Sequence, residues 1–189
     1  IERITEIAIK IANQRKKKIC SVDKSNVLEV SQLWRDTVSN VTAKDKGLSL
    51  SNMYVDNAAM QLVRDPSQFD VILTSNLFGD ILSDLAAMLT GSIGMLPSAS
   101  LNKSGPGVFE PVHGSAPDIA GKNIANPIAM LLSASMMLKI GLNEAEAGEN
   151  IENAIDRVLS RGFRTADLNN GSCEVLSCSE IGEKIIDEI

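Results

Sequence analysis

The chain has 189 residues, 44% of them hydrophobic and 22% charged, a composition typical of a folded globular α/β protein and not of a disordered or fibrous one. Its formal net charge of −6 excludes the basic stripe that nucleic-acid binders use, so we expect no nucleic-acid partner. The longest apolar stretch, 127–140, is too short to cross a bilayer, and we expect no membrane partner.

The beginning of the chain predicts a helix, a strand and a second helix. Apolar residues at helical spacing predict a helix over 2–18, and the short apolar run after it predicts a strand over 19–22. Asparagine favours the N-cap position, so we expect Asn26 to begin a helix that runs through Trp34.

Two further helices and a strand are predicted before residue 90. Asp56 is expected at the start of a helix that stops before Pro66, and the β-branched run 69–74 predicts a strand. After Asn76 we expect a helix with one apolar face, which consists of Leu77, Ile81, Leu85 and Met88.

The amino-acid composition changes over 90–121, where glycine, proline and serine become frequent. This composition predicts loops, short strands and a crossover between domains. The asparagine–proline pair at 126–127 predicts a helix start, and Gly162 predicts the end of a helix that begins near Glu144. The Ser-x-x-Glu pattern at 177–180 predicts a reciprocally capped terminal helix.

Three carboxylates are candidate metal ligands. Asp80 and Asp84 lie one turn apart on one face of the predicted helix, where like charges repel unless a cation is bound. Carboxylates with open positions for substrate oxygens suit Mg²⁺ or Mn²⁺. Asp56, flanked by small residues, is the third candidate. The alternatives are a solvated helix face for the pair and a helix N-cap for Asp56.

Lys24 is a candidate proton acceptor. It follows the predicted strand over 19–22, and open α/β sheets bind their ligands at the carboxyl ends of strands. A lysine desolvated there can exchange protons near neutral pH. The alternative is an ordinary surface lysine.

The loop 110–118 is a candidate ligand-binding loop. Its small residues allow a close approach of the backbone, His113 can stack on a ring, and Asp118 can accept ribose hydroxyls. Neither G-x-G-x-x-G nor a phosphate-loop motif occurs, so these residues alone predict only a small-ligand site.

Five segments together resemble the 3-isopropylmalate dehydrogenases, and they occur in that family's order over nearly the whole chain. They are residues 22–36, 54–64, 69–89, 96–101 and 109–127. The resemblance implies the C-terminal half of the α/β fold shared by isocitrate and isopropylmalate dehydrogenases. Residues 1–90 would then be part of the dimer-forming, substrate-binding domain, and residues 91–189 the returning part of the NAD-binding domain.

The resemblance also implies roles for individual residues. Asp80 and Asp84 would bind the divalent metal, Mg²⁺ or Mn²⁺, together with Asp56 and Lys24 from the second subunit of a homodimer. Lys24 and Asp56 would be the catalytic residues of this chain. Asn26 would approach the nicotinamide end of NAD. The adenosine part would be held by His113, Gly114, Ser115, Ala116, Pro117, Asp118 and Asn126. The acidic Asp118 implies NAD, because it would repel the 2′-phosphate of NADP.

The implied reaction is the oxidative decarboxylation of 3-isopropylmalate to 4-methyl-2-oxopentanoate in leucine biosynthesis. Hydride would pass from C2 to NAD while Lys24 accepts the hydroxyl proton, and the metal would stabilise the enolate formed as carbon dioxide leaves. Compared with the family, the N-terminal half and its substrate-binding arginines are absent. We therefore expect the chain alone to be inactive and to need that missing half as a partner.

Two other functions stay open. One is a sibling enzyme that acts on isocitrate, homoisocitrate or tartrate, and the other is a non-catalytic half that only dimerises. Retention of Lys24, Asp56, Asp80 and Asp84 favours descent from a working enzyme. Three cysteines without a Cys-x-x-Cys pair favour a reducing compartment, so we expect the bacterial cytoplasm, with the plastid stroma as the alternative.

Overall fold

The computed structural model describes residues 1–103, 105 and 107–189. They form two compact units, Ile1–Ala86 and Ala87–Ile189. The boundary lies within helix α4 (Asn76–Thr90). The sequence had predicted a division four residues later, after residue 90. What each unit contributes to function stays a prediction.

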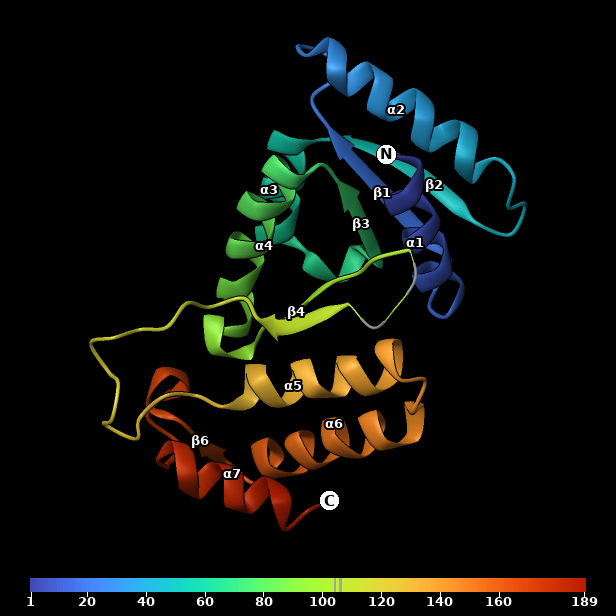
Figure 1. Ribbon diagram of the computed structural model, residues 1–189. Helices are drawn as coiled ribbons and strands as arrows, with labels where there is room; N and C mark the ends of the chain where they lie inside the picture. Colours follow the sequence, from blue (N-terminus) through green and yellow to red (C-terminus); the bar gives the residue numbers. More distant parts are fainter. Residues whose placement is uncertain (104, 106) are drawn as a thin grey trace. The chain divides into compact units, whose positions relative to one another are not determined.

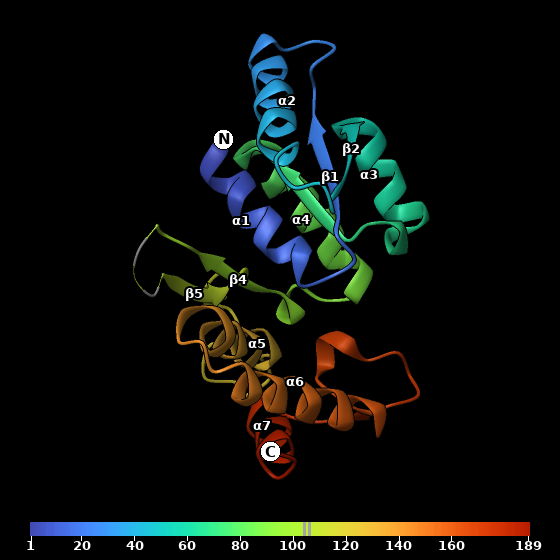
Figure 2. The same ribbon diagram turned by 90° about the vertical axis from the view of Figure 1, so that its right-hand side faces the viewer.

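The first unit is a parallel sheet with helices on both faces (Figures 1 and 2). Its strands are β1 (Lys18–Asp23), β2 (Ser49–Tyr54) and β3 (Val71–Thr74), in the order β2-β1-β3. The helices are α1 (Glu2–Asn13), α2 (Glu29–Thr42), α3 (Val55–Arg64) and α4, and a 3₁₀ turn spans Pro66–Gln68. The parallel sheet with its helices confirms the predicted α/β fold class.

The central strand β1 is buried on both faces, and alternate side chains enter two different cores. Ile19 packs with Trp34 and Val38 of α2 and with residues of α1. Cys20 and Val22 point to the other face, where α3 and α4 contribute Ala58, Leu62 and Leu82. The period of two therefore places α1 and α2 on one side of the sheet and α3 and α4 on the other.

The second unit is built mainly of helices. Its helices are α5 (Ile128–Met136), continued by a π-helical turn over Met137–Gly141, α6 (Ala145–Ser160) and α7 (Cys178–Ile186). Two small sheets accompany them: antiparallel β4 (Pro97–Ser100) with β5 (Val108–Pro111), and parallel β6 (Phe163–Arg164) with β7 (Glu174–Val175). Short 3₁₀ turns span Ile93–Met95 and Ala166–Leu168. Helices α5, α6 and α7 lie side by side (Figure 1). Ile128, Ile155 and Ile181, one from each helix, are buried in one core cluster.

Several predicted helix ends are confirmed. Helix α3 stops at Arg64, before Pro66. Helix α6 is followed by Gly162, whose φ of +90° favours glycine. Ser177 and Glu180 cap α7 reciprocally, as the Ser-x-x-Glu pattern predicted.

Two predictions in the first part of the chain were wrong. Helix α1 ends at Asn13, not at residue 18, because the chain turns into β1 through Lys17 at a φ of +58°. Asn26 does not cap α2, which begins at Glu29 and runs past Trp34 to Thr42. Instead, the carbonyl of Lys24 accepts hydrogen bonds from the backbone N–H groups of residues 27 and 28, so this stretch is a turn.

The predicted apolar face of α4 exists, but most of it lies on the surface of the chain. Leu77, Ile81 and Met88 are 65%, 58% and 69% exposed, whereas Leu82 and Ala87 are buried. Within the described residues, no helix is long and apolar enough to cross a membrane.

Candidate functional site

Lys24 and Asp56 form an ion pair at the carboxyl end of the sheet. Lys24 follows β1 directly, and Asp56 lies in the first turn of α3, which follows β2 without a loop. The Lys24 Nζ atom donates to Asp56 Oδ1 over 2.5 Å, and the two side chains are 26% and 60% exposed. The hydrogen bond from Lys24 and the backbone N–H of Asp56 lower the pKa of that carboxyl, so it is ionised at neutral pH.

Asp80 and Asp84 are exposed on α4, one turn apart. No salt bridge neutralises either carboxylate within the described part of the chain. Their oxygens are the donor type that Mg²⁺ and Mn²⁺ prefer. Across the same described residues, no three histidine, cysteine, aspartate or glutamate side chains gather closely enough to hold a metal. A metal bound here would need further ligands from substrate or from another copy.

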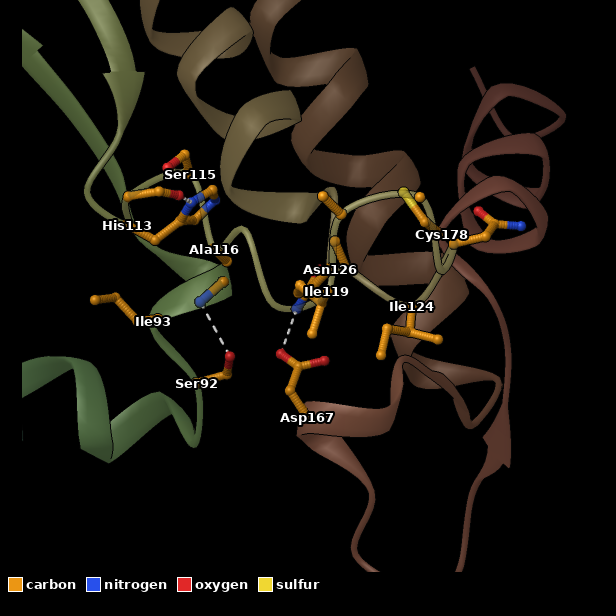
Figure 3. A pocket seen from close by; sticks show the side chains of 16 residues that line it. Ser92, Ile93, His113, Ser115, Ala116, Ile119, Ile124, Asn126, Asp167 and Cys178 are labelled. Atoms are coloured by element: carbon orange, nitrogen blue, oxygen red, sulfur yellow. Dashed lines mark hydrogen bonds between the residues drawn. The ribbon is translucent and has the colours of Figure 1, made fainter.

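A cavity of about 820 Å³ opens in the second unit (Figure 3). This volume lies in the range of small-molecule and cofactor sites. Five of the seven predicted NAD-binding residues line it: His113, Gly114, Ser115, Ala116 and Asn126. Pro117 and Asp118 are exposed on the same loop but are not part of the lining.

Asn126 lines the cavity and forms a hydrogen bond with Asp167, which is far away in the sequence. Its Oδ1 accepts from the backbone N–H of Ile128 at 2.9 Å, which caps α5, and its Nδ2 donates to Asp167 Oδ2 at 3.0 Å. The amide therefore holds a helix start and an acidic side chain at one point of the cavity wall (Figure 3). Gly94 permits this arrangement, because a Cβ there would lie 2.9 Å from that of Asn126.

Asp167 gives the cavity its carboxylate. Burial alone would raise its pKa, but hydrogen bonds from side chains that include Ser92 and Asn126 outweigh burial and lower it. Sequence patterns did not predict Asp167, nor Ser92, Ile93 and Cys178, which also line the cavity. No local pattern marks Asp167, because its partner Asn126 is 41 residues away.

His113 lines the cavity, and its ring lies against the backbone of Gly114. Its Nδ1 is 2.9 Å from the carbonyl oxygen of Gly114, and the ring is partly exposed. Ala116 has a φ of +42°, so the loop bends sharply after the small residues. The loop thus presents an imidazole beside backbone groups that a ligand can approach closely.

The sequence model of the family described as isocitrate/isopropylmalate dehydrogenase matches residues 1–185. The chain is 89% identical over its whole length to a 3-isopropylmalate dehydrogenase of Prochlorococcus marinus (strain MIT 9312), of which it covers 53%. It is 61% identical to a 3-isopropylmalate dehydrogenase of Thermosynechococcus vestitus, of which it covers 52%. The chain therefore spans about half the length of these relatives.

Solved structures show the same fold. An isocitrate dehydrogenase from Methylococcus capsulatus matches with a TM-score of 0.91 and 38% identity, over 99% of this chain and 55% of that one. A beta-decarboxylating dehydrogenase from Thermococcus kodakarensis matches with a TM-score of 0.88 and 40% identity, over 99% of this chain and 54% of that one. The resemblance predicted from five sequence segments is confirmed.

Proposed function

Since the chain belongs to the isocitrate/isopropylmalate dehydrogenase family, we propose that it is part of an enzyme that oxidises and decarboxylates 3-isopropylmalate in leucine biosynthesis. The observation that carries the proposal is the 89% identity, over the whole chain, to the Prochlorococcus marinus 3-isopropylmalate dehydrogenase. The chain spans about half of that relative, so we propose this activity for the complete protein.

The residues of the first unit fit a divalent metal site shared between two copies. Asp80 and Asp84 offer carboxylate oxygens without a salt bridge among the described residues, and Asp56 of a second copy would add a third ligand. When bound, Mg²⁺ or Mn²⁺ supplies a Lewis acid, and NAD supplies the hydride acceptor.

Lys24 is the proposed acceptor of the substrate's hydroxyl proton. It lies at the strand end that α/β sheets use for ligands, and it would accept the proton as a neutral amine. The ammonium group so formed would be paired with Asp56, whose Oδ1 atom is 2.5 Å from Lys24 Nζ. The pKa of Asp56 is lowered chiefly by the hydrogen bond from Lys24, so this carboxylate is ionised at neutral pH and can hold the Lys24 side chain in place. The pair thus fixes where the proton is received.

The cavity of the second unit is the proposed site for the adenosine part of NAD. Its volume, its small residues and the ring of His113 support this assignment. Asp118, exposed on the same loop, would accept the ribose hydroxyls and disfavour a 2′-phosphate.

A homodimer is supported by apolar surface on the first unit. Met60 and Val63 of α3 are each 62% exposed, and Leu77 and Ile81 of α4 are exposed as well. Apolar side chains gathered on neighbouring helices indicate a surface that another chain covers. The three free cysteines support a reducing compartment, and we propose the bacterial cytoplasm.

The proposed function can be tested by exchanging segments. In the 3-isopropylmalate dehydrogenase of Prochlorococcus marinus (strain MIT 9312), the matching residues are replaced by this chain; we call the product the exchange protein. With NAD and Mn²⁺, we expect NADH formation from 3-isopropylmalate and little from isocitrate, homoisocitrate or tartrate. A preference for one of the other acids would replace the proposed substrate, and an inactive, correctly folded exchange protein would overturn the proposal.

A further inference from the structure

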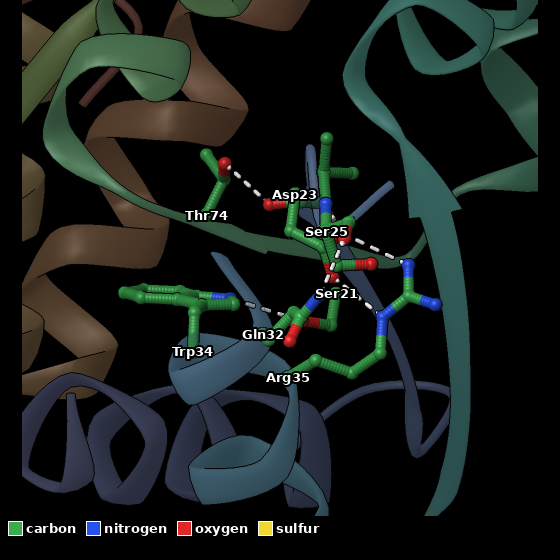
Figure 4. A network of polar contacts seen from close by, with 8 residues as sticks. Ser21, Asp23, Ser25, Gln32, Trp34, Arg35 and Thr74 are labelled. Carbon is green, nitrogen blue, oxygen red and sulfur yellow. Dashed lines mark hydrogen bonds and ion pairs between the residues drawn. The ribbon is translucent and has the colours of Figure 1, made fainter. Parts of the chain in front are cut away.

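We propose that Arg35, on helix α2, is a positioning residue that keeps the side chains of Lys24 and Asp56 in contact with each other. The role given to Lys24 rests on the proposed function, whereas the contacts that hold it do not. Arg35 lies on α2 and reaches the ends of both β1 and β2, the strands that lead directly into Lys24 and Asp56 (Figure 4).

Asp23, the last residue of β1, is the first link. Its side chain is 2% exposed, and a buried carboxylate is unfavourable unless it is paired and hydrogen-bonded. Arg35 supplies the pair as a fork, with Nε donating to Oδ2 at 2.8 Å and Nη2 donating to Oδ1 at 2.9 Å. Two parallel bonds fix the orientation of the carboxylate as well as its position.

The orientation of Asp23 fixes the backbone around Lys24. Asp23 Oδ1 also accepts from the backbone N–H of Ser25 at 2.9 Å. The carbonyl of Lys24 accepts from the N–H groups of Val27 and Leu28 at 3.0 and 2.9 Å. Hydrogen bonds at Ser25 and at the Lys24 carbonyl therefore fix the backbone around Lys24. From this fixed backbone, the Lys24 side chain reaches Asp56.

The second link is Tyr54, the last residue of β2. Tyr54 is the register partner of Asp23 in the parallel pairing of β1 with β2, and it is also the N-cap of α3. The Arg35 guanidinium lies 5.2 Å from the centroid of the Tyr54 ring, within the distance of a cation–π contact. One guanidinium therefore touches the strand end before Lys24 and the helix start that carries Asp56.

Arg35 thus acts on the reacting groups only through Asp23 and Tyr54. Without it, Asp23 would be a buried carboxylate lacking its cation, and the turn at Lys24 would relax toward solvent. A displacement of about 1 Å at a reacting group can reduce a rate on the order of 100-fold. Loss of Arg35 should consequently affect the proton-transfer step more than the binding of the adenosine part of NAD, whose proposed site lies in the second unit.

The chain contains a matched control at the opposite end of β1. Arg15 Nε donates to Asp70 Oδ1 at 2.8 Å, and the Asp70 side chain is 1% exposed. Asp70 also accepts from the backbone N–H groups of Lys16 and Lys18, before and at the start of β1. Arg15→Met and Arg35→Met therefore each remove an arginine from a buried carboxylate of the same sheet, but only Arg35 faces Lys24.

The first experiment measures the Lys24–Asp56 geometry in the chain as it is. A carbodiimide joins an amine to a carboxylate only when the two are in contact, and Lys24 Nζ and Asp56 Oδ1 are 2.5 Å apart. Peptide mass spectrometry then gives the yield of the Lys24–Asp56 cross-link. We expect Arg35→Met to lower the yield at least several-fold, Arg35→Lys to give an intermediate yield, and Arg15→Met to leave it unchanged. Circular dichroism identifies unfolded variants, and Arg35→Lys decides the question if Arg35→Met does not fold.

The second experiment is kinetic and uses the exchange protein. We expect Arg35→Met to lower kcat about 10- to 100-fold with a much smaller change in the KM for NAD, and Arg15→Met to change neither. Equal cross-link yields in the wild-type and Arg35 variants, or equal kinetic effects of the two arginine substitutions, would overturn the positioning role. An exchange protein that is inactive with Arg35 intact would instead contradict the proposed function, and the cross-link yields would still decide the role of Arg35.

Discussion

Replacing Asn126 by alanine should destabilise the second unit in two separable ways. The substitution removes the Oδ1 atom that caps α5 at Ile128 and the Nδ2 atom that donates to Asp167. A lost helix cap costs about 1 kcal/mol. A hydrogen bond to a charged group contributes about 1.5–3 kcal/mol, but Asp167 remains partly in water, so we assign about 0.5–1 kcal/mol to this bond.

The sum predicts a loss of roughly 1.5–2 kcal/mol in the free energy of unfolding for Asn126→Ala. At about 2–4 °C per kcal/mol for a chain of this size, the midpoint should fall by roughly 3–8 °C. Thermal and urea unfolding followed by circular dichroism measures the change. The single tryptophan, Trp34, lies in the first unit and reports on that unit separately.

Two further variants separate the contributions. Asn126→Ser keeps a side-chain oxygen for the cap and loses the amide donor, so it should lose only about half as much stability. A double-mutant cycle between Asn126→Ala and Asp167→Ala should give a coupling of about 0.5–1 kcal/mol. If Asn126→Ala unfolds within about 0.5 kcal/mol of the wild type, or if serine is no better than alanine, the account of this residue is wrong.

Three other changes have defined outcomes. Leu82→Ala, on the buried face of α4, should lower the free energy of unfolding by about 2–4 kcal/mol. Val30→Ala, on the exposed face of α2 and outside the proposed dimer surface, should change it by less than about 0.5 kcal/mol. Chemical denaturation of both variants checks this, and equal losses would refute the burial pattern. Ser177→Ala should cost about 1 kcal/mol by removing the α7 cap, with Ser177→Asp, which keeps an acceptor, as the control that must recover most of it. Burial alone would raise the pKa of Asp70, but Arg15 and two backbone N–H groups lower it below its ordinary value, so its contribution is present above about pH 4 and is lost as the pH falls. The stability difference between wild type and Asp70→Asn should therefore shrink on acidification from about pH 5 to about pH 2, and a difference that is independent of pH would contradict the assignment.

Local patterns predicted the elements whose interactions are local. The short apolar run over 19–22 corresponds to β1, and the Ser-x-x-Glu pattern at 177–180 forms the α7 cap because both partners lie within one turn. Pro66 and Gly162 ended their helices for reasons of backbone geometry that need no tertiary context.

Contacts between distant segments account for the predictions that failed. Asn26 has the right side chain for an N-cap, but it lies in the turn that follows β1, where Asp23, held by Arg35, accepts from the backbone N–H of Ser25. Helix α2 therefore begins only at Glu29. Asp167 reaches the cavity only because Asn126 and Asp167, far apart in sequence, meet in the folded unit. The apolar face of α4 was predicted correctly as a pattern, but a pattern does not tell whether its own chain or another covers it.

The central claim is that Asp80 and Asp84 hold the divalent metal of a decarboxylating dehydrogenase. The most direct test is calorimetric titration of the exchange protein with Mn²⁺, comparing wild type with the double variant Asp80→Asn, Asp84→Asn. Glu2 and Glu6, exposed at the same spacing on α1, provide the matched control variant Glu2→Gln, Glu6→Gln. We predict saturable Mn²⁺ binding that disappears in the aspartate variant and persists in the glutamate variant. Undiminished binding after loss of Asp80 and Asp84 would contradict the claim.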